Sequence, residues 1–201
     1  MGKKVWLITG VAQGLVHMTI KYLLSKKQQV IVLSRDSNGY DHSTLSNPDL
    51  ELIKLNPDKE EDVQKAIRHI AGKYTGIDVM INNADFGLFN IPKQRTMEEV
   101  SQIGKHQVNT TLNMIWQALP LMRQNSNAHL INFSSLKTEN DIALLPIEII
   151  RTSVLNHFCN MLDKYTQDIG IRSTLVAPGS LFSALSPIPA ELRSLGDELV
   201  N

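Results

Sequence analysis

The sequence predicts an α/β fold in which a doubly wound parallel sheet has helices on both of its faces. Short apolar runs of strand length alternate with longer segments of helical periodicity, which is typical of strands joined by crossover helices. The apolar runs are continuous, as in residues 29–34, and parallel strands that are buried on both faces have this character. Right-handed crossovers then place helices on both faces of the sheet.

The first half of the chain supplies the first three strands. Residues 4–9 form an apolar strand, and a helix with apolar periodicity follows at residues 15–25. The second strand covers residues 29–34, and a third, shorter strand covers residues 50–55. The helix predicted at residues 60–74 begins with acidic side chains, which suit the positive end of the helix dipole.

The second half of the chain continues the alternation. Residues 79–82 are the fourth strand, and residues 96–121 hold one long helix or two. The fifth strand is predicted at residues 129–134, a further helix at 147–168, and the sixth strand at 172–177.

Length and charge restrict the classes of protein to which the chain can belong. Its 201 residues suit one domain, which we expect over residues 1–182, with a Pro- and Ser-richer tail of loop and one short helix over 183–201. Lys plus Arg and Asp plus Glu both total 20, so the formal net charge is zero. No basic face is demanded, and we expect neither a nucleic-acid partner nor a metal site.

The single cysteine, Cys159, excludes an internal disulfide and fits a reducing compartment. It lies in an apolar helical stretch, which favours a buried structural thiol. The sequence contains no signal-peptide pattern and no apolar run long enough to span a bilayer. We therefore expect a soluble, cytoplasmic protein without a membrane partner.

A glycine-containing segment joins the first strand to the first helix. It reads Thr9-Gly10-Val11-Ala12-Gln13-Gly14-Leu15-Val16. A strand, a glycine turn and a helix in this order place a dinucleotide pyrophosphate on a helix N-terminus. This predicts a Rossmann-like, three-layer α/β/α domain, although such a turn alone is a weak indication because it occurs in many α/β proteins.

Four further motifs follow on the expected elements. They are Asn82-Asn83-Ala84-Asp85 after the fourth strand, Asn109 in the long helix, Ser134-Ser135 at the end of the fifth strand, and Pro178-Gly179 after the sixth. In this order, and over about residues 3–182, the chain resembles the short-chain dehydrogenase/reductases. Taken singly, Asn82 and Asn83 could instead satisfy backbone groups beside the sheet.

The resemblance implies a nicotinamide dinucleotide site. Its cofactor-binding positions are Thr9, Gly10, Gly14, Leu15, Arg35, Asn56, Asn83, Ala84, Pro178 and Gly179. Arg35 follows the second strand, and no acidic residue ends that strand, a pattern that favours NADP over NAD. The alternative for Arg35 is a solvated loop arginine. Asn56 replaces the family's adenine-contacting aspartate, and its amide oxygen still accepts a hydrogen bond.

Two substitutions weaken the expected cofactor site. Val16 replaces the third glycine of the turn, which in the family allows close packing of helix on strand. Overpacking there costs roughly 1–3 kcal/mol unless the helix moves outward. Asp85 replaces the glycine of the Asn-Asn-Ala-Gly motif and brings a carboxylate close to the cofactor phosphates.

The family's proton donor and its lysine are both replaced. Members reduce a carbonyl by hydride transfer, or run the reverse reaction, with a tyrosine whose pKa is lowered by a lysine one helical turn later. These positions are Glu148 and Thr152 here, whereas Asn109 and Ser135 of the catalytic group are retained. An ionised Glu148 would repel a developing alkoxide, and Arg151 favours the ionised form, so Glu148 is not favoured as the acid.

Three functions therefore stay open at this point. The first is a degenerate family member that binds a nucleotide or accompanies another subunit with weak or no turnover. The second is an active NADP-dependent oxidoreductase that acts on a small carbonyl or alcohol with an atypical proton donor. The third is a structural interaction protein that binds no nucleotide.

The resemblance also implies a homodimer and a shortened sheet. Two apolar stripes at helical spacing suit either a dimer face, as in the family, or packing on the sheet; they are Leu112, Ile115, Trp116 and Leu119, and Ile150, Val154, Phe158 and Met161. Family members usually continue further and add a seventh strand. We therefore expect six strands here, with the usual last strand missing.

Overall fold

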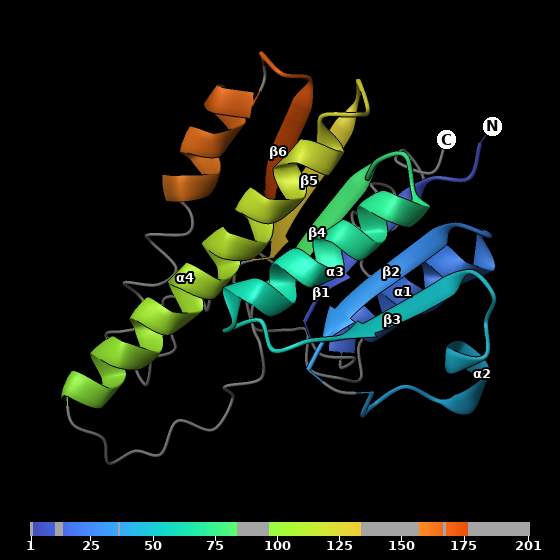
Figure 1. Ribbon diagram of the computed structural model, residues 1–201, viewed down its shortest axis with the longest axis horizontal. Coiled ribbons are helices and arrows are strands. Elements are labelled where there is room, and N and C mark those ends of the chain that lie inside the picture. The colour runs from blue at the N-terminus through green and yellow to red at the C-terminus, as the bar shows by residue number, and fades with distance from the viewer. Residues whose placement is uncertain are drawn as a thin grey trace.

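The computed structural model describes residues 2–10, 14–35, 37–83, 97–133, 157–166 and 168–176. Six strands within these ranges form one sheet in the order β3-β2-β1-β4-β5-β6, and all neighbouring pairs are parallel (Figure 1). The strands are β1 (Val5–Thr9), β2 (Gln29–Ser34), β3 (Leu50–Lys54), β4 (Val79–Asn83), β5 (Ala128–Phe133) and β6 (Ile171–Val176). The predicted six-stranded parallel sheet is confirmed.

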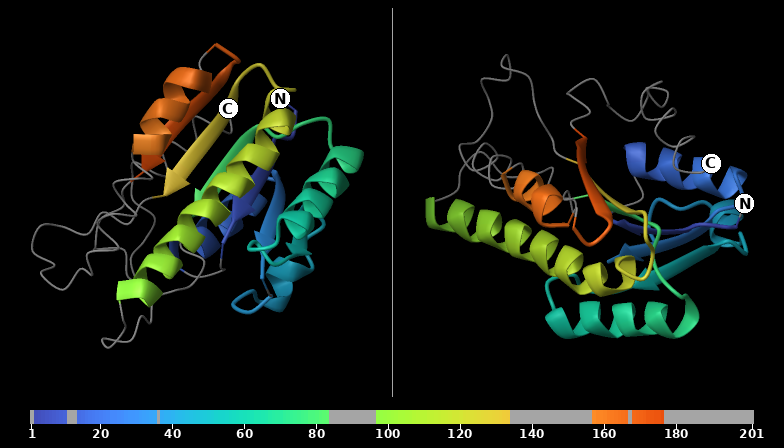
Figure 2. Two further views of the ribbon diagram at one scale, coloured as in Figure 1. Left: turned by 60° about the vertical axis from the view of Figure 1, so that its left-hand side comes forward. Right: turned by 90° about the horizontal axis from the view of Figure 1, so that it is seen from above.

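Helices cover both faces of this sheet. Helix α1 (Gly14–Ser25) lies on one face, and α3 (Glu60–Lys73) and α4 (Met97–Met122) lie on the other (Figure 2). Residues 157–166 are also helical, and Leu162 from this segment joins the core beneath α3 and α4. The predicted three-layer, doubly wound arrangement is therefore confirmed.

Alternating side chains of the strands build two separate cores. On β1, Leu7 packs with Met80 and Leu130 on the face covered by α3 and α4. Trp6 and Ile8 point to the opposite face, where residues of α1 cover them. Because successive side chains of a strand alternate between faces, a strand buried on both sides needs apolar residues at every position. This accounts for the continuous apolar runs in the sequence.

The strand order reverses at β1. Strand β1 pairs with β2 on one side and with β4 on the other, so the two halves of the chain diverge from this point. In open α/β sheets, ligands bind outside the carboxyl ends of the strands at such a switch point. We therefore expect the candidate site next to Thr9 and Asn83, the last residues of β1 and β4.

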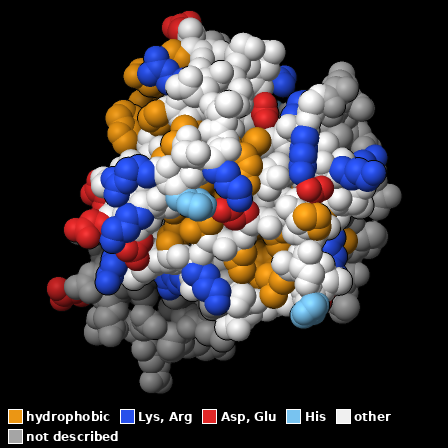
Figure 3. All heavy atoms as spheres, turned by 45° about the vertical axis from the view of Figure 1, so that its right-hand side comes forward, with side chains coloured by type: hydrophobic (Ala, Val, Ile, Leu, Met, Phe, Trp, Pro, Cys, Tyr) orange, Lys and Arg blue, Asp and Glu red, His pale blue; other side chains and the backbone are white. Residues whose placement is uncertain are grey.

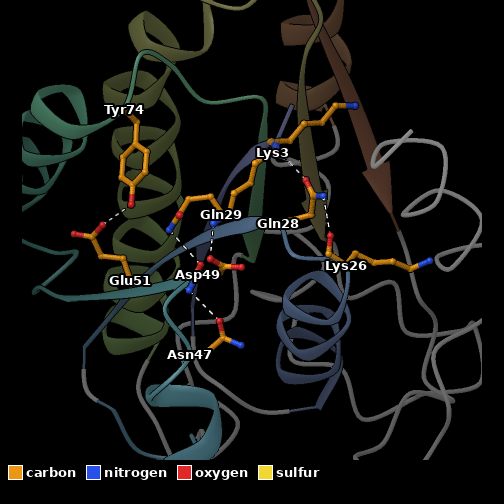
Figure 4. Close-up of polar contacts among 9 residues, drawn as sticks. Lys3, Lys26, Gln28, Gln29, Asn47, Asp49, Glu51 and Tyr74 are labelled. Atoms are coloured by element: carbon orange, nitrogen blue, oxygen red, sulfur yellow. Dashed lines mark hydrogen bonds and ion pairs between the residues drawn. The ribbon is translucent and has the colours of Figure 1, made fainter. Parts of the chain in front are cut away.

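The opposite edge of the sheet is held together by side-chain contacts. Lys3 forms an ion pair with Asp49, and Gln29 Nε2 donates to the Asp49 carbonyl oxygen at 3.2 Å (Figure 4). Lys3 lies two residues before β1, Gln29 is the first residue of β2, and Asp49 directly precedes β3. The contacts fix the amino-terminal edge of the sheet, away from the switch point.

A four-residue polar cluster ties β3 to the end of α3. The Glu51 carboxylate lies 2.6 Å from His69 Nε2 and accepts hydrogen bonds from Lys73 Nζ at 2.8 Å and from the Tyr74 hydroxyl at 2.7 Å. Burial raises the pKa of the Glu51 carboxyl, but the bonds from Lys73, His69 and Tyr74 outweigh burial and lower this pKa to about 2. The cluster therefore holds Glu51 ionised.

One helix was not predicted from the sequence. Helix α2 (His42–Leu45) is a single turn, and the Asp41 side chain caps it by accepting a hydrogen bond from Thr44 N at 2.7 Å. The long helix is continuous as α4, with Pro120 near its end. Of the helix predicted over 147–168, residues 157–166 are described and helical. The predicted tail over 183–201 and the missing seventh strand concern residues outside the described ranges.

Burial and surface composition bear on the remaining expectations. Cys159 is buried, as predicted, and desolvation raises the pKa of its thiol to about 11. Cationic and anionic side chains are interspersed on the face that Figure 3 shows. Among the described helices, none is both long enough and apolar enough to cross a lipid bilayer.

Candidate functional site

Three buried polar side chains lie side by side at the carboxyl ends of β1, β4 and β5. Thr9 Oγ1 donates to Asn82 Oδ1 at 2.9 Å, and Asn82 Nδ2 donates to Asn132 Oδ1 at 3.1 Å. Thr9 is 0% exposed, Asn82 1% and Asn132 4%. Asn82 thus bonds to side chains of both neighbouring strands, which differs from the backbone role that its motif alone suggests. This row of hydrogen-bonded side chains, Thr9, Asn82 and Asn132, fixes the ends of three strands at the switch point.

The turn after β1 starts with a glycine that no other residue could replace without strain. Gly10 has φ +112°, and a Cβ built on it would lie 2.8 Å from Asn83 Nδ2. Its N–H donates to the Leu33 carbonyl oxygen at 3.2 Å, and Asn83 N donates to Thr9 Oγ1 at 3.2 Å. The missing side chain therefore lets the backbone pack directly against Asn83, as the first glycine of a tight strand-to-helix turn requires.

Helix α1 begins at Gly14, four residues after Gly10, and its first turn contains no acidic residue. Helix α3, by contrast, has Glu60, Glu61 and Asp62 in its first turn. A helix N-terminus carries a partial positive charge, and among the described residues the first turn of α1 adds no carboxylate that would offset it. The residues present thus fit the phosphate groups of a dinucleotide.

Val16 is buried in α1, at 4% exposure, in the core cluster that contains Trp6 and Ile8. Its side chain contributes to the core between α1 and the sheet. Its effect on the distance between helix and strand, and thereby on cofactor affinity, stays a prediction.

Arg35 has a partner that neither sequence interpretation included. Its Nη2 donates to Asp58 Oδ1 at 3.1 Å and to Asp58 Oδ2 at 2.9 Å. Asp58 follows β3, and its backbone N–H donates to Asn56 Oδ1 at 3.1 Å. Arg35 is therefore not a free loop arginine, because its guanidinium is engaged by a carboxylate at the carboxyl edge of β2 and β3.

Asn109 lies on α4 and is exposed. It lines an open hollow of about 550 Å³ between α4, the loop after β3 and the helical segment 157–166. The neighbouring Thr110 donates its hydroxyl to Asp58 Oδ1 at 3.3 Å. Asp58 and Phe158 line the same hollow, which therefore lies next to the Arg35–Asp58 pair.

Comparisons with known proteins identify the family and the fold of this chain. The family described as short chain dehydrogenase matches residues 4–187, which is most of the chain. The chain belongs to the short-chain dehydrogenase family. An uncharacterized oxidoreductase of Staphylococcus aureus strain MW2 is 21% identical over 185 residues, covering 91% of this chain and 80% of the relative.

Solved structures show the same fold. A short chain dehydrogenase from Leptospira borgpetersenii with bound NAD⁺ has a TM-score of 0.77 at 21% identity, covering 92% of this chain and 74% of that one. A 3-ketoacyl-(acyl-carrier-protein) reductase from Brucella melitensis complexed with NADH has a TM-score of 0.74 at 21% identity, with 88% and 75% covered.

A third solved structure also has this fold. It is a short chain oxidoreductase from Pseudomonas aeruginosa, described as containing an atypical catalytic center. Its TM-score is 0.75 at 15% identity, with 87% of this chain and 69% of that chain covered.

The structure brings together part of the family site that the sequence predicts. Thr9, Gly10 and Asn83 meet at the switch point, whereas Arg35 and Asn56 lie at the ends of β2 and β3. The backbone of Gly14 and Leu15 starts α1. The other predicted site positions lie outside the described residues; they are Ala84, Asp85, Ser135, Glu148, Thr152, Pro178 and Gly179.

Sequence reasoning missed Asp58 and the bond between Asn82 and Asn132. A signal for Asp58 existed, since parallel neighbours end at one edge of a sheet and an acidic residue follows β3 where an arginine follows β2. The sequence holds no comparable signal for the Asn82–Asn132 bond, because that bond depends on the register of β4 and β5.

The two apolar stripes divide between core and surface. Ile115 and Leu119 are buried in the core beneath α4, whereas Trp116 is 67% exposed. From residues 157–166, Met161 is 58% exposed and Tyr165 is 67% exposed. The described stripe residues thus lie partly in the core and partly at the surface. Ile150 and Val154 lie outside the described residues, and the dimer face stays a prediction.

Proposed function

We propose that this short-chain dehydrogenase binds a dinucleotide at the β1–β4 switch point, NADP in preference to NAD, and turns over weakly or not at all. The observation that carries the binding proposal is the close approach of Gly10 to Asn83. Gly10 matches the glycine that the family uses for the tight turn beside its pyrophosphate site, and the first turn of α1 has no acidic residue.

Arg35 supports the preference for NADP. It follows β2 directly, and β2 ends at Ser34 rather than at an acidic residue that would bind a ribose 2′-hydroxyl. The guanidinium is a planar donor that suits a phosphate. Its existing pair with Asp58 would have to open for this contact.

The sequence supports impaired turnover. A bound nicotinamide supplies or accepts a hydride, so the chain itself must provide a proton donor at the substrate oxygen. Glu148 and Thr152 replace the family's tyrosine and lysine, and an ionised carboxylate cannot donate that proton. Asn109 and Ser135 remain to orient a small carbonyl or alcohol. A companion role beside an active subunit fits these losses.

A second candidate is an active NADP-dependent oxidoreductase with an atypical proton donor. The Pseudomonas aeruginosa oxidoreductase with an atypical catalytic center favours it, since that protein has this fold. A steady-state assay of NADPH oxidation against a panel of small aldehydes and ketones separates the two candidates. We expect no turnover above the blank. Turnover that Ser135→Ala removes would favour the second candidate.

We also propose a homodimer through α4 and residues 157–166. The exposed Trp116, Met161 and Tyr165 would be removed from water in such an interface, and aromatic side chains are enriched at interface centres. A cytoplasmic location is proposed from the single, buried Cys159. The third candidate, an interaction protein that binds no nucleotide, requires that no dinucleotide stabilise the folded chain.

A further inference from the structure

The Arg35–Asp58 pair is built between two neighbouring strand ends. Strands β2 and β3 are parallel, with Ser34 opposite Lys54, so the residues that follow them emerge at one edge. One nitrogen of Arg35, Nη2, contacts both carboxylate oxygens of Asp58, at 3.1 and 2.9 Å. This is the edge at which the 2′-position of a bound adenosine is expected.

Asp58 is held in place independently of Arg35. Thr110 Oγ1 on α4 donates to Asp58 Oδ1 at 3.3 Å, and the Asp58 backbone N–H donates to Asn56 Oδ1 at 3.1 Å. The Asp58 side chain is 24% exposed, compared with 43% for Arg35. The carboxylate is thus the fixed partner, and the longer, more exposed arginine is the partner that can move.

The surroundings of Asp58 carry further negative charge. Glu60, Glu61 and Asp62 form the first turn of α3, two to four residues after Asp58. These carboxylates suit the dipole of α3, but they oppose a phosphate dianion at the same edge. Because Glu60 and Glu61 are exposed, solvent screens this repulsion, and each acts on a 2′-phosphate more weakly than a carboxylate in contact with Arg35.

We infer that Asp58 sets the nucleotide preference by competing with a 2′-phosphate for Arg35. A phosphate that recruits the Arg35 guanidinium must first separate it from Asp58, and the released carboxylate then faces the phosphate. NAD has no such requirement. The wild-type chain should therefore prefer NADP only weakly, and removal of the Asp58 charge should strengthen that preference. This inference rests on the proposed dinucleotide site.

Isothermal titration calorimetry of the full chain with NADP and NAD at low ionic strength tests the inference. Asp58→Asn should tighten NADP binding by about fivefold, the worth of one exposed ion pair, and leave the Kd for NAD unchanged. Asp58→Ala should do the same. The double variant Arg35→Gln with Asp58→Asn should lose the gain. Because the preference is a ratio within one variant, a lower folded fraction affects both ligands equally.

Two matched controls isolate the contact. Glu61→Gln removes a nearby charge of the same sign and leaves the Arg35 pair in place, so it should change the NADP-to-NAD ratio by less than twofold. Thr110→Val removes the hydroxyl that supports Asp58 and leaves its charge, and it should not raise the ratio.

The outcomes distinguish this inference from the proposed function. If wild type and variants bind NADP but Asp58→Asn leaves the ratio unchanged, or Glu61→Gln raises it equally, the pair does not set the preference. If neither NADP nor NAD binds any variant at millimolar concentration, the proposed dinucleotide site is itself wrong, and the inference is overturned with it.

Discussion

Asn83 lies so close to Gly10 that a Cβ on this glycine would sit 2.8 Å from Asn83 Nδ2. The glycine also has φ +112°, a conformation that L side chains rarely adopt. The contact joins the turn after β1 to the end of β4, the two strands that flank the switch point. Two features therefore require a glycine at position 10: the close contact with Asn83 and the positive φ.

Gly10→Ala should destabilise the fold by about 1–3 kcal/mol and weaken dinucleotide binding, because the new methyl group is strained and meets Asn83. Urea unfolding measures the first effect and calorimetry the second. Gly72→Ala is the matched control, since a Cβ on Gly72 meets nothing within 4 Å and the residue lies inside α3. That control should be neutral or stabilising by up to about 1 kcal/mol. Equal losses in both variants would contradict the account.

The Thr9 hydroxyl should contribute more to stability than another buried threonine hydroxyl. Thr9→Val leaves Asn82 Oδ1 without its donor and Asn83 N without its acceptor, which should cost about 1–3 kcal/mol. Thr166→Val removes a hydroxyl that donates to the Leu162 carbonyl within a helix, and it should cost less than about 1 kcal/mol. Chemical denaturation of both variants measures the loss of unfolding free energy. A larger loss in Thr166→Val than in Thr9→Val would contradict a stabilising role for the Thr9–Asn82–Asn132 row.

Acid should destabilise the fold through His129. This side chain is 4% exposed, and its Nε2 lies 2.7 Å from Thr174 Oγ1. Burial, aided by Arg172, lowers the pKa of His129 from 6.5 to about 4. Between these values the unfolded chain binds a proton that the folded chain does not. The contribution of His129 to stability is therefore constant above about pH 6.5 and falls as the pH drops towards 4.

Unfolding free energies measured from pH 7 to pH 4 test this sign. His129→Gln should remove up to roughly 3 kcal/mol of the decline, as the pKa difference implies. His42→Gln, which replaces a histidine on the exposed turn α2, should keep the decline. If the pH dependence is the same in wild type and His129→Gln, another group causes it.

The exposed aromatic face should hold two copies of the chain together. Trp116→Glu with Tyr165→Glu should convert a dimer to a monomer, because each change puts a charge where apolar area is buried on association. Light scattering coupled to size exclusion measures the mass. Leu45→Glu, at an exposed leucine on α2, should leave the mass unchanged. A wild-type chain that is monomeric at high concentration would disprove the dimer.

The sequence predicts the fold well because the central strands β1, β2, β4 and β5 are buried on both faces. Such strands appear as continuous apolar runs, and the predicted limits of β1 and β2 lie within one residue of the observed ones. Helix α2 has no comparable signal, because a single turn is too short to show a period. Its start depends on Asp41, which caps it through one hydrogen bond to Thr44 N.

The site is less predictable because its decisive contacts join residues far apart in the sequence. Gly10 could be identified from its motif, but the motif does not say which side chain it meets. Arg35 and Asp58 are 23 residues apart, and their pairing depends on the ends of β2 and β3 meeting at one edge. Asn82 and Asn132 are likewise 50 residues apart and meet only through strand register.

The central claim is that the switch point still binds a dinucleotide. Thermal unfolding in the presence of NADP, NADPH, NAD and NADH tests it most directly, since a ligand that binds only the folded chain adds about 2.7 kcal/mol at a hundred times its Kd. We expect a concentration-dependent rise with NADP and NADPH that Gly10→Ala diminishes. No rise with any of the four at millimolar concentration would contradict the claim and favour a protein partner instead.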